Sequence, residues 1–352
     1  MTDMPARPLT ASDRPIPHAS DSDQASRAPG PSRAGTVKML PDVMMIEGRR
    51  LRYATSDNTD ACGPEGPGSE PVWAVNIHGY FAGGGMYWRE SSHLAKTLGW
   101  RVVNPSLPGF AGSDPLPWER VSMAEIAGQV TALLDHLGIR RAILLGHSMG
   151  GAVAVKLAAR DPARTLGIIY RDGAATPAWK KRHGPLVAAL APLVPDVAGI
   201  ADLVTAVVMD FPDLLVGRRI ASTMRGMWPD ARRNIRTLGR TLPVGAMLFA
   251  VDLSDEVARI AADGEIPILP AWGCFDRIAN LATAEEFARL ARSDIMWIPG
   301  GHSWMLARPR GQGDALRFLA RGQAFLAQVA TRRARLLGLD GRRAKGVLRA
   351  LR

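Results

Sequence analysis

Short apolar runs alternate with segments of helical periodicity from about residue 43 to residue 301. The runs are rich in β-branched residues and nearly free of polar ones, which is typical of strands buried on both faces. We expect strands at 43–48, 50–56, 72–80, 101–107, 141–148, 167–173, 266–273 and 294–301, the first two as a hairpin. We expect helices between them at 88–98, 123–137, 150–160 and 284–291. This alternation predicts an α/β fold with a mostly parallel central sheet flanked by helices on both faces.

One long segment, residues 176–262, breaks this alternation, because it has helix-like stretches and no clear strand. It includes the apolar stretch 184–217, in which prolines and aspartates recur. An insertion between two strands at the ligand-binding edge of a parallel sheet is well placed to cover a pocket. We therefore predict a helical cap inserted before the last two strands, with additional core as the alternative. The core itself is expected to consist of residues 38–175 and 263–330.

Both ends of the chain differ from this core in composition. Residues 1–37 are rich in Pro, Ser, Asp and Ala, so we predict a disordered segment without the apolar stretch of a signal peptide. Residues 331–352 hold eight Arg or Lys and one Asp, which gives 8 − 1 = +7 of the formal charge of +11. Two interpretations of this basic tail are open: contact with an anionic membrane or acidic partner, or a solvated end. We do not predict nucleic-acid binding, since the sequence has no motif for it.

The cysteine content, the apolar runs and the spacing of possible metal ligands narrow the expected cellular compartment and chemistry. The only cysteines are Cys62 and Cys274, too few for a disulfide framework or a thiolate metal site, which favours a cytoplasmic protein. No apolar run reaches the length of about eighteen residues that predicts a membrane-spanning helix. No cluster of His, Cys and Asp has metal-ligand spacing, so we expect neither a metal nor an organic cofactor.

A serine stands where the predicted strand 141–148 turns into the predicted helix 150–160. Gly146 and Gly150 flank Ser148 two residues to either side, and they remove the Cβ atoms that would clash in a sharp turn. Such a turn exposes the serine Oγ beside the free N–H groups of a helix N-terminus. This Gly-x-Ser-x-Gly setting predicts a nucleophile elbow, with an ordinary glycine-rich turn as the alternative.

Four motifs together resemble the α/β-hydrolase superfamily, in its serine-nucleophile, esterase- or lipase-like branch. They are His78-Gly79-Tyr80, Leu107-Pro108-Gly109-Phe110-Ala111-Gly112-Ser113-Asp114, Gly146-His147-Ser148-Met149-Gly150-Gly151, and Gly273 to Asp276 with Gly301-His302. The resemblance covers about residues 43–329 and implies the α/β-hydrolase fold. One departure is Asn104, since many relatives carry an aspartate shortly before the Pro-Gly turn, and this leaves the subfamily open.

The resemblance also implies where the acid and the base lie, because the base of this superfamily follows the last strand and comes after the acid. His302 in GGHSW fits the base, and Asp276 in AWGCFDRIAN fits the acid that orients it. Asp172, which ends the preceding strand, is the alternative acid. The other histidines lie in predicted helices, in the insertion, in the N-terminal segment, or beside the serine and pointing away from it: His93, His136, His183, His18 and His147.

An oxyanion hole in this superfamily is made of two backbone N–H groups. One is that of Met149, the residue after the serine. By resemblance the other is that of Tyr80 in the loop after VWAVNIHG, with Phe81 as the alternative. His78 and Gly79 belong to the same loop as structural residues of the motif.

A serine at the elbow indicates acyl transfer through an acyl-enzyme, from which water releases the acid. The apolar insertion favours a lipophilic small-molecule ester, so the expected function is that of a carboxylesterase or lipase-like serine hydrolase. The same elbow occurs in carbon–carbon bond hydrolases and cofactor-free haloperoxidases, which are the alternatives. A non-catalytic, ligand-binding member of the fold is a more remote alternative.

Overall fold

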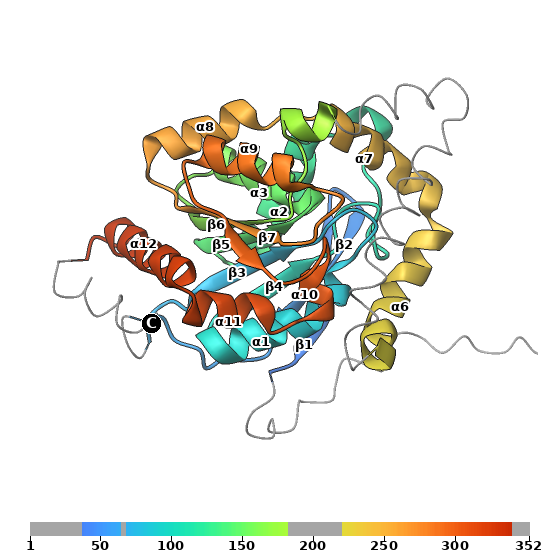
Figure 1. The fold of residues 1–352 in the computed structure, drawn as a ribbon. Helices are drawn as coiled ribbons and strands as arrows, with labels where there is room; N and C mark the ends of the chain where they lie inside the picture. Colours follow the sequence, from blue (N-terminus) through green and yellow to red (C-terminus); the bar gives the residue numbers. More distant parts are fainter. Residues whose placement is uncertain (1–36, 65–67, 182–219, 340–352) are drawn as a thin grey trace, which may run out of the picture. The chain divides into compact units, whose positions relative to one another are not determined.

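An eight-stranded sheet forms the centre of the chain (Figure 1). The computed structural model describes residues 37–64, 68–181 and 220–339. The strand order is β1-β2-β4-β3-β5-β6-β7-β8, in which β2 is antiparallel to both of its neighbours and all other neighbouring pairs are parallel. The bounds are β1 Met39–Ile46, β2 Arg49–Ser56, β3 Trp73–Ile77, β4 Arg101–Pro105, β5 Ala142–His147, β6 Thr165–Arg171, β7 Ile268–Gly273 and β8 Met296–Ile298.

Helices cover both faces of this sheet (Figure 1). One core layer includes α2, α3, α8 and α9, and the other includes α1, α10, α11 and α12. Among the described residues, the short 3-10 helices are η2 Gly84–Tyr87 and η3 Trp118–Arg120. The α-helices of the same residues are α1 Trp88–Leu98, α2 Met123–His136, α3 Met149–Arg160, α6 Ile220–Arg236, α7 Leu238–Ala250, α8 Ser254–Asp263, α9 Leu281–Ala291, α10 Trp304–Ala307, α11 Gly311–Phe318 and α12 Ala320–Leu336.

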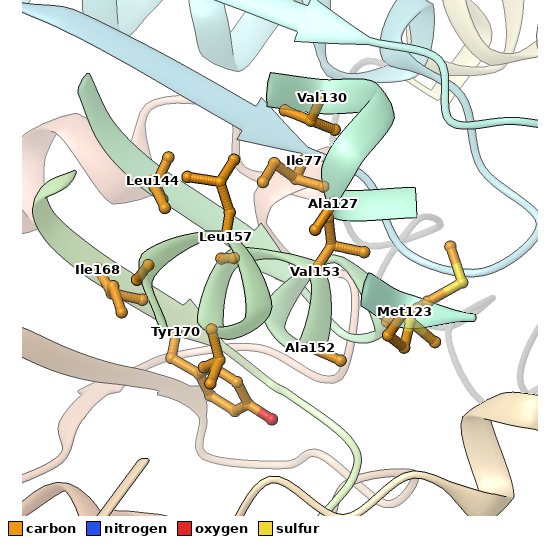
Figure 2. Close-up of a cluster of buried hydrophobic side chains, with 14 of the residues drawn as sticks. Ile77, Met123, Ala127, Val130, Leu144, Ala152, Val153, Leu157, Ile168 and Tyr170 are labelled. Atoms are coloured by element: carbon orange, nitrogen blue, oxygen red, sulfur yellow. The ribbon is translucent and has the colours of Figure 1, made fainter. Parts of the chain in front are cut away.

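The amphipathic pattern of the sequence explains how α2 packs. Ser122 caps the helix, since its hydroxyl accepts a hydrogen bond from the Glu125 N–H. The fully buried residues at helical spacing are Ile126, Val130 and Leu133. Figure 2 shows the apolar side chains of α2 and α3 against those of the strands, among them Ile77, Leu144 and Ile168. The core on this face therefore follows from the same pattern that predicted the helix.

The described part of the predicted insertion is helical. α6, α7 and α8 follow one another between β6 and β7, so they precede the last two strands as predicted. Residues 182–219, which include most of the apolar stretch, lie outside the described residues. The fold is therefore an α/β fold with a mostly parallel sheet and a helical insertion before the last two strands.

α12 continues across the boundary expected after residue 330 and ends at Leu336. Arg332 is buried, and its guanidinium donates to the carbonyl oxygens of Pro162, Thr165 and Glu265 at 2.6, 2.7 and 2.8 Å. The expected boundary is therefore too early, because the first residues of the predicted basic tail belong to a core helix. The rest of that tail, residues 340–352, and the predicted disordered segment up to residue 36 lie outside the described residues.

The described residues also bear on two expectations from composition. None of their helices combines the length and the apolar character needed to cross a membrane. Cys62 and Cys274 are both exposed, and both are free thiols.

Candidate active site

The join between β5 and α3 holds Ser148 in a strained backbone conformation. Its φ and ψ angles are 51° and −117°, a region that residues other than glycine rarely adopt. A Cβ on Gly146 would lie 2.4 Å from the Gly150 carbonyl oxygen, and one on Gly150 would lie 2.3 Å from the Ile77 carbonyl oxygen. The close approach of α3 to β5 and β3 is therefore the reason for glycine at both positions.

Asp276 and His302 meet beyond the carboxyl ends of the last two strands. His302 Nδ1 lies 2.9 Å from Asp276 Oδ2, and both residues are at most 9% exposed. Asp276 Oδ1 accepts from the N–H groups of Ile278 and Ala279 at 2.8 and 3.0 Å. A carboxylate can only accept, so His302 Nδ1 donates, and Nε2 is left as the ring nitrogen that can take a proton. This geometry suits a general base held by an acid.

Asp172, the alternative acid, lies beside this pair. Its two oxygens accept from the Gly273 N–H and the Trp304 Nε1–H at 2.7 and 2.6 Å. Complete burial, and then the nearby charge of Asp276, raise the pKa of Asp172 well above its usual range. The polar atoms of Asp172, Asp276 and His302 lie within 4.8 Å of one another, a spacing that would also suit a metal ion. The contact between Asp276 and His302, together with the hydrogen bonds of Asp172 to Gly273 and Trp304, holds the three side chains at this spacing.

His147 and Tyr87, which sequence reasoning left out of the site, connect the loop after β3 with His302. The Tyr87 hydroxyl accepts from the Gly79 N–H at 3.3 Å and lies 2.6 Å from His147 Nδ1. His147 Nε2 lies 2.9 Å from the His302 carbonyl oxygen, so Nε2 donates there and Nδ1 accepts from Tyr87. Burial, and then the charge of His302, hold the pKa of His147 well below its usual range, which favours this neutral form. The sequence carries no signal for the contact, because Tyr87 and His147 are 60 positions apart.

His78 braces the same loop in a neutral form. Its Nδ1 lies 2.7 Å from the Gly79 carbonyl oxygen and donates to it, and its Nε2 accepts from the Leu107 N–H at 2.9 Å. Burial lowers the pKa of His78 to about 4. His78 therefore ties the loop after β3 to the loop after β4.

The two predicted oxyanion donors belong to elements that meet at the serine. Met149 is the first residue of α3, so its N–H has no partner within the helix. Tyr80 lies in the loop after β3, where a Cβ on Gly79 would lie only 3.2 Å from the Ser148 Cβ. The Tyr80 hydroxyl donates to the Thr241 carbonyl oxygen of α7 at 3.2 Å. The role of these two N–H groups as an oxyanion hole stays a prediction.

A buried charged network, which sequence reasoning also missed, lies behind the elbow. The Arg171 carbonyl oxygen accepts from the Ser148 N–H at 2.9 Å. The Arg171 guanidinium donates to Glu90 Oε1 and to Asn76 Oδ1, both at 2.7 Å, and all three residues are at most 1% exposed. A buried charge is tolerated only when it is paired and hydrogen-bonded. The network therefore couples the serine turn to β3 and α1.

A comparison with protein families gives one match, described as alpha/beta hydrolase fold, over residues 75–308. This range covers most of the chain and includes Ser148, Asp276 and His302. The chain belongs to the α/β-hydrolase family. The superfamily and the fold predicted from the four motifs are thereby confirmed.

Individual members of the family are related to the chain at moderate identity. The AB hydrolase superfamily protein YisY of Bacillus subtilis is 29% identical over 222 residues, which are 61% of this chain and 78% of that protein. A protein of Mycobacterium phage D29 described as "Putative non-heme haloperoxidase" is 26% identical over 246 residues, 69% of this chain and 85% of that protein. A thermophilic esterase from Thermogutta terrifontis has a similar fold, with a TM-score of 0.55 and 21% identity over 81% of this chain and 97% of that one.

Proposed function

We propose that this α/β hydrolase is a serine hydrolase that forms an acyl-enzyme on Ser148, with His302 as the general base and Asp276 as the acid that orients it. The observation that carries the proposal is the 2.9 Å contact between the buried side chains of Asp276 and His302. The strained Ser148 at the strand–helix turn supports the assignment of the nucleophile. Membership in the family supports hydrolase chemistry.

The proposed reaction has two steps. His302 Nε2 takes the hydroxyl proton while Ser148 Oγ attacks the ester carbonyl, and the N–H groups of Met149 and Tyr80 stabilise the oxyanion. Collapse of the tetrahedral intermediate expels the alcohol, which receives the proton from His302 and leaves an acyl group on Ser148. Water then attacks the acyl-enzyme with the same base, and the carboxylic acid is released. Asp276 stabilises the imidazolium in both steps.

The proposed substrate is a lipophilic small-molecule ester, as for a carboxylesterase or lipase-like enzyme. The apolar stretch 184–217 of the insertion supports this class. A second candidate reaction is perhydrolysis, in which hydrogen peroxide replaces water in the second step and a peracid is released. The 26% identity to the phage protein described as a haloperoxidase supports this candidate.

Two further expectations remain proposals. The free thiols of Cys62 and Cys274 support a reducing compartment, the cytoplasm. The Arg and Lys residues of 340–352, beyond the buried Arg332 and Arg333, support contact with an anionic membrane or an acidic partner.

Hydrolysis of p-nitrophenyl esters from acetate to palmitate tests the proposed function. We expect Ser148→Ala to lower kcat by more than about a thousandfold. Ser293→Ala, two residues beyond the end of α9, is the matched control and should keep wild-type activity. Hydrolysis that survives in Ser148→Ala would contradict the proposal. A wild-type protein that reacts with a fluorophosphonate at Ser148 and hydrolyses no ester would shift the assignment to perhydrolysis or carbon–carbon bond hydrolysis.

A further inference from the structure

Two helices of the insertion hold the loop that follows β3. The Asn234 side chain of α6 donates to the carbonyl oxygens of Phe81 and Ala82 at 2.8 and 3.0 Å. The Tyr80 hydroxyl donates to the Thr241 carbonyl oxygen of α7 at 3.2 Å. Three consecutive loop residues are thus hydrogen-bonded to the insertion.

Asn234 is fully buried, and all polar atoms of its amide take part in hydrogen bonds. Its Oδ1 accepts from the Ala111 N–H, in the loop after β4, at 2.6 Å. Only this orientation of the amide satisfies all three partners, because two carbonyl oxygens need a donor and the Ala111 N–H needs an acceptor. Asn234 therefore joins α6 to the loops after β3 and β4.

Two of the residues that hydrogen-bond to the Asn234 amide, Phe81 and Ala111, have strained backbones. The φ angle of Phe81 is 59° and that of Ala111 is 50°, although neither residue is glycine. Such conformations persist only where the surroundings over-determine them. The Asn234 amide supplies part of this restraint at both positions, so the loop after β3 should relax when the amide is removed.

α6 also packs closely against the loop after β3, and this packing restrains the loop further. A Cβ on Gly83 or on Gly85 would lie 2.6 Å from Asp230 Oδ2. Asp230 precedes Asn234 by four residues and therefore lies on the same face of α6. A displacement of α6 would be transmitted to the loop that contains Tyr80.

We propose that Asn234 is a positioning residue that fixes the loop bearing the Tyr80 N–H, so that α6 contributes to the oxyanion hole. This inference rests on the proposed acyl transfer at Ser148. The oxyanion develops only in the transition state, and a donor displaced by a fraction of an ångström loses much of its effect there. Loss of the Asn234 contacts should therefore lower kcat and leave KM nearly unchanged.

Two variants of Asn234 and one matched control test the kinetic consequence. Asn234→Asp keeps an acceptor for the Ala111 N–H and removes both donors, and Asn234→Ala removes all three contacts. Ile235→Ala is the control, because Ile235 is the next residue of α6 and is 59% exposed. We expect kcat on p-nitrophenyl esters to fall at least about tenfold in both Asn234 variants, with KM within about threefold of wild type. Affinity for a trifluoromethyl ketone, which forms a tetrahedral adduct with the serine, should fall by the same factor as kcat.

Hydrogen exchange followed by mass spectrometry gives a second readout that does not depend on ester hydrolysis. In both Asn234 variants a peptide covering residues 79–86 should exchange at least about tenfold faster, while peptides from β5 keep the wild-type rate. Unchanged exchange would overturn the proposal, and faster exchange with unchanged kcat would overturn the link to the oxyanion hole. A wild-type protein that neither hydrolyses esters nor reacts with a fluorophosphonate at Ser148 would refute the proposed function, and the exchange rates would still decide whether Asn234 holds the loop.

Discussion

Ser148, Asp172 and Phe81 have positive φ angles of 51°, 46° and 59°, although none of them is glycine. Ser148 and Asp172 directly follow β5 and β6, and Phe81 lies in the loop after β3. Each such conformation costs of order 1–3 kcal/mol and persists only where hydrogen bonds and packing leave no alternative. The backbone strain of the three residues is thus concentrated at the carboxyl edge of the parallel strands, where the candidate active site lies.

The two carboxylates near His302 should differ sharply when each is replaced. Asp276→Asn should lower kcat about ten-thousandfold, because an amide stabilises the wrong tautomer of the histidine. Asp172→Asn should lower kcat by less than about tenfold and should mainly lower the melting temperature, because the Asp172 oxygens accept from Gly273 and Trp304. The measurement is kcat of both variants on one ester, together with thermal unfolding. Equal losses of kcat would show that Asp276 is not the only acid.

Burial of His78 should make the protein less stable on acidification. Its folded-state pKa is about 4 against an ordinary value of 6.5, so between these pH values the unfolded chain binds a proton that the folded protein excludes. Above pH 6.5 the histidine is neutral in both states, so it does not lower the free energy of unfolding. As the pH decreases from 6.5 to 4, the free energy of unfolding should fall by up to about 3 kcal/mol.

Urea unfolding at several pH values measures this slope. His78→Asn should show a shallower slope than wild type, because the titrating group is gone. The exposed His136 provides the control variant His136→Gln, which should keep the wild-type slope. An unchanged slope in His78→Asn would show that other groups cause the pH dependence.

At the scale of the elements, the turn at Ser148 depends on three elements, because α3 packs closely against both β5 and β3. A Cβ on Gly150 would lie 2.3 Å from the Ile77 carbonyl oxygen and 2.7 Å from that of His78. These are backbone atoms of a buried strand and its loop, so they cannot move aside as a flexible side chain would. The first turn of α3 is therefore held against β3, and its free N–H groups are held beside Ser148.

Alanine at Gly150 should be destabilising, whereas alanine at a second helical glycine should not. Gly150→Ala should lower the free energy of unfolding by about 2 kcal/mol or more, because the new methyl group overlaps backbone atoms. At Gly128 of α2, the nearest atom to a new Cβ is Arg160 Nη1 at 3.2 Å, the far end of a long, flexible side chain. Gly128→Ala should therefore leave stability unchanged or raise it by up to about 1 kcal/mol. Urea unfolding of both variants checks this order, and a reversed order would contradict the assigned packing.

At the scale of the whole molecule, buried arginines connect elements that are distant in the sequence. Arg171 of β6 is paired with Glu90 of α1, and Arg332 of α12 binds carbonyl oxygens at or just before the first residues of β6 and β7. A buried guanidinium without partners is costly. These contacts therefore specify how α1 and α12 lie on their face of the sheet.

Two truncations should separate α12 from the rest of the basic C-terminal segment. A chain ending at Leu339 keeps every described contact and should melt within about 2 °C of the full chain. A chain ending at Ala330 loses Arg332 with its three carbonyl contacts and should melt about 10 °C lower or fail to fold. Thermal unfolding by circular dichroism measures both. Equal melting temperatures would show that the end of α12 does not stabilise the core.

Much of the fold could be predicted because its signals are local. The predicted strand 141–148 and helix 150–160 agree closely with β5 and α3, since apolar runs and glycine spacing depend on neighbouring residues. The prediction of a basic tail is wrong for Arg332 and Arg333, which are buried; the Arg333 guanidinium donates to the Glu70 carbonyl oxygen at 2.5 Å. In the sequence their charge is typical of a solvated end, and only their distant carbonyl partners make them part of the core.

The sequence by itself therefore determined the alternation of strands and helices, the elbow around Ser148, and the acid and base candidates Asp276 and His302. Only the tertiary structure decided that Asp276 contacts His302 while Asp172 lies beside them, and that Asn234 holds the loop after β3. The physical reason is the separation along the chain over which each interaction acts. Hydrophobic period and glycine sterics act over a few residues, whereas Asn234 and Phe81 are 153 positions apart and meet only once the sheet and the insertion have packed together.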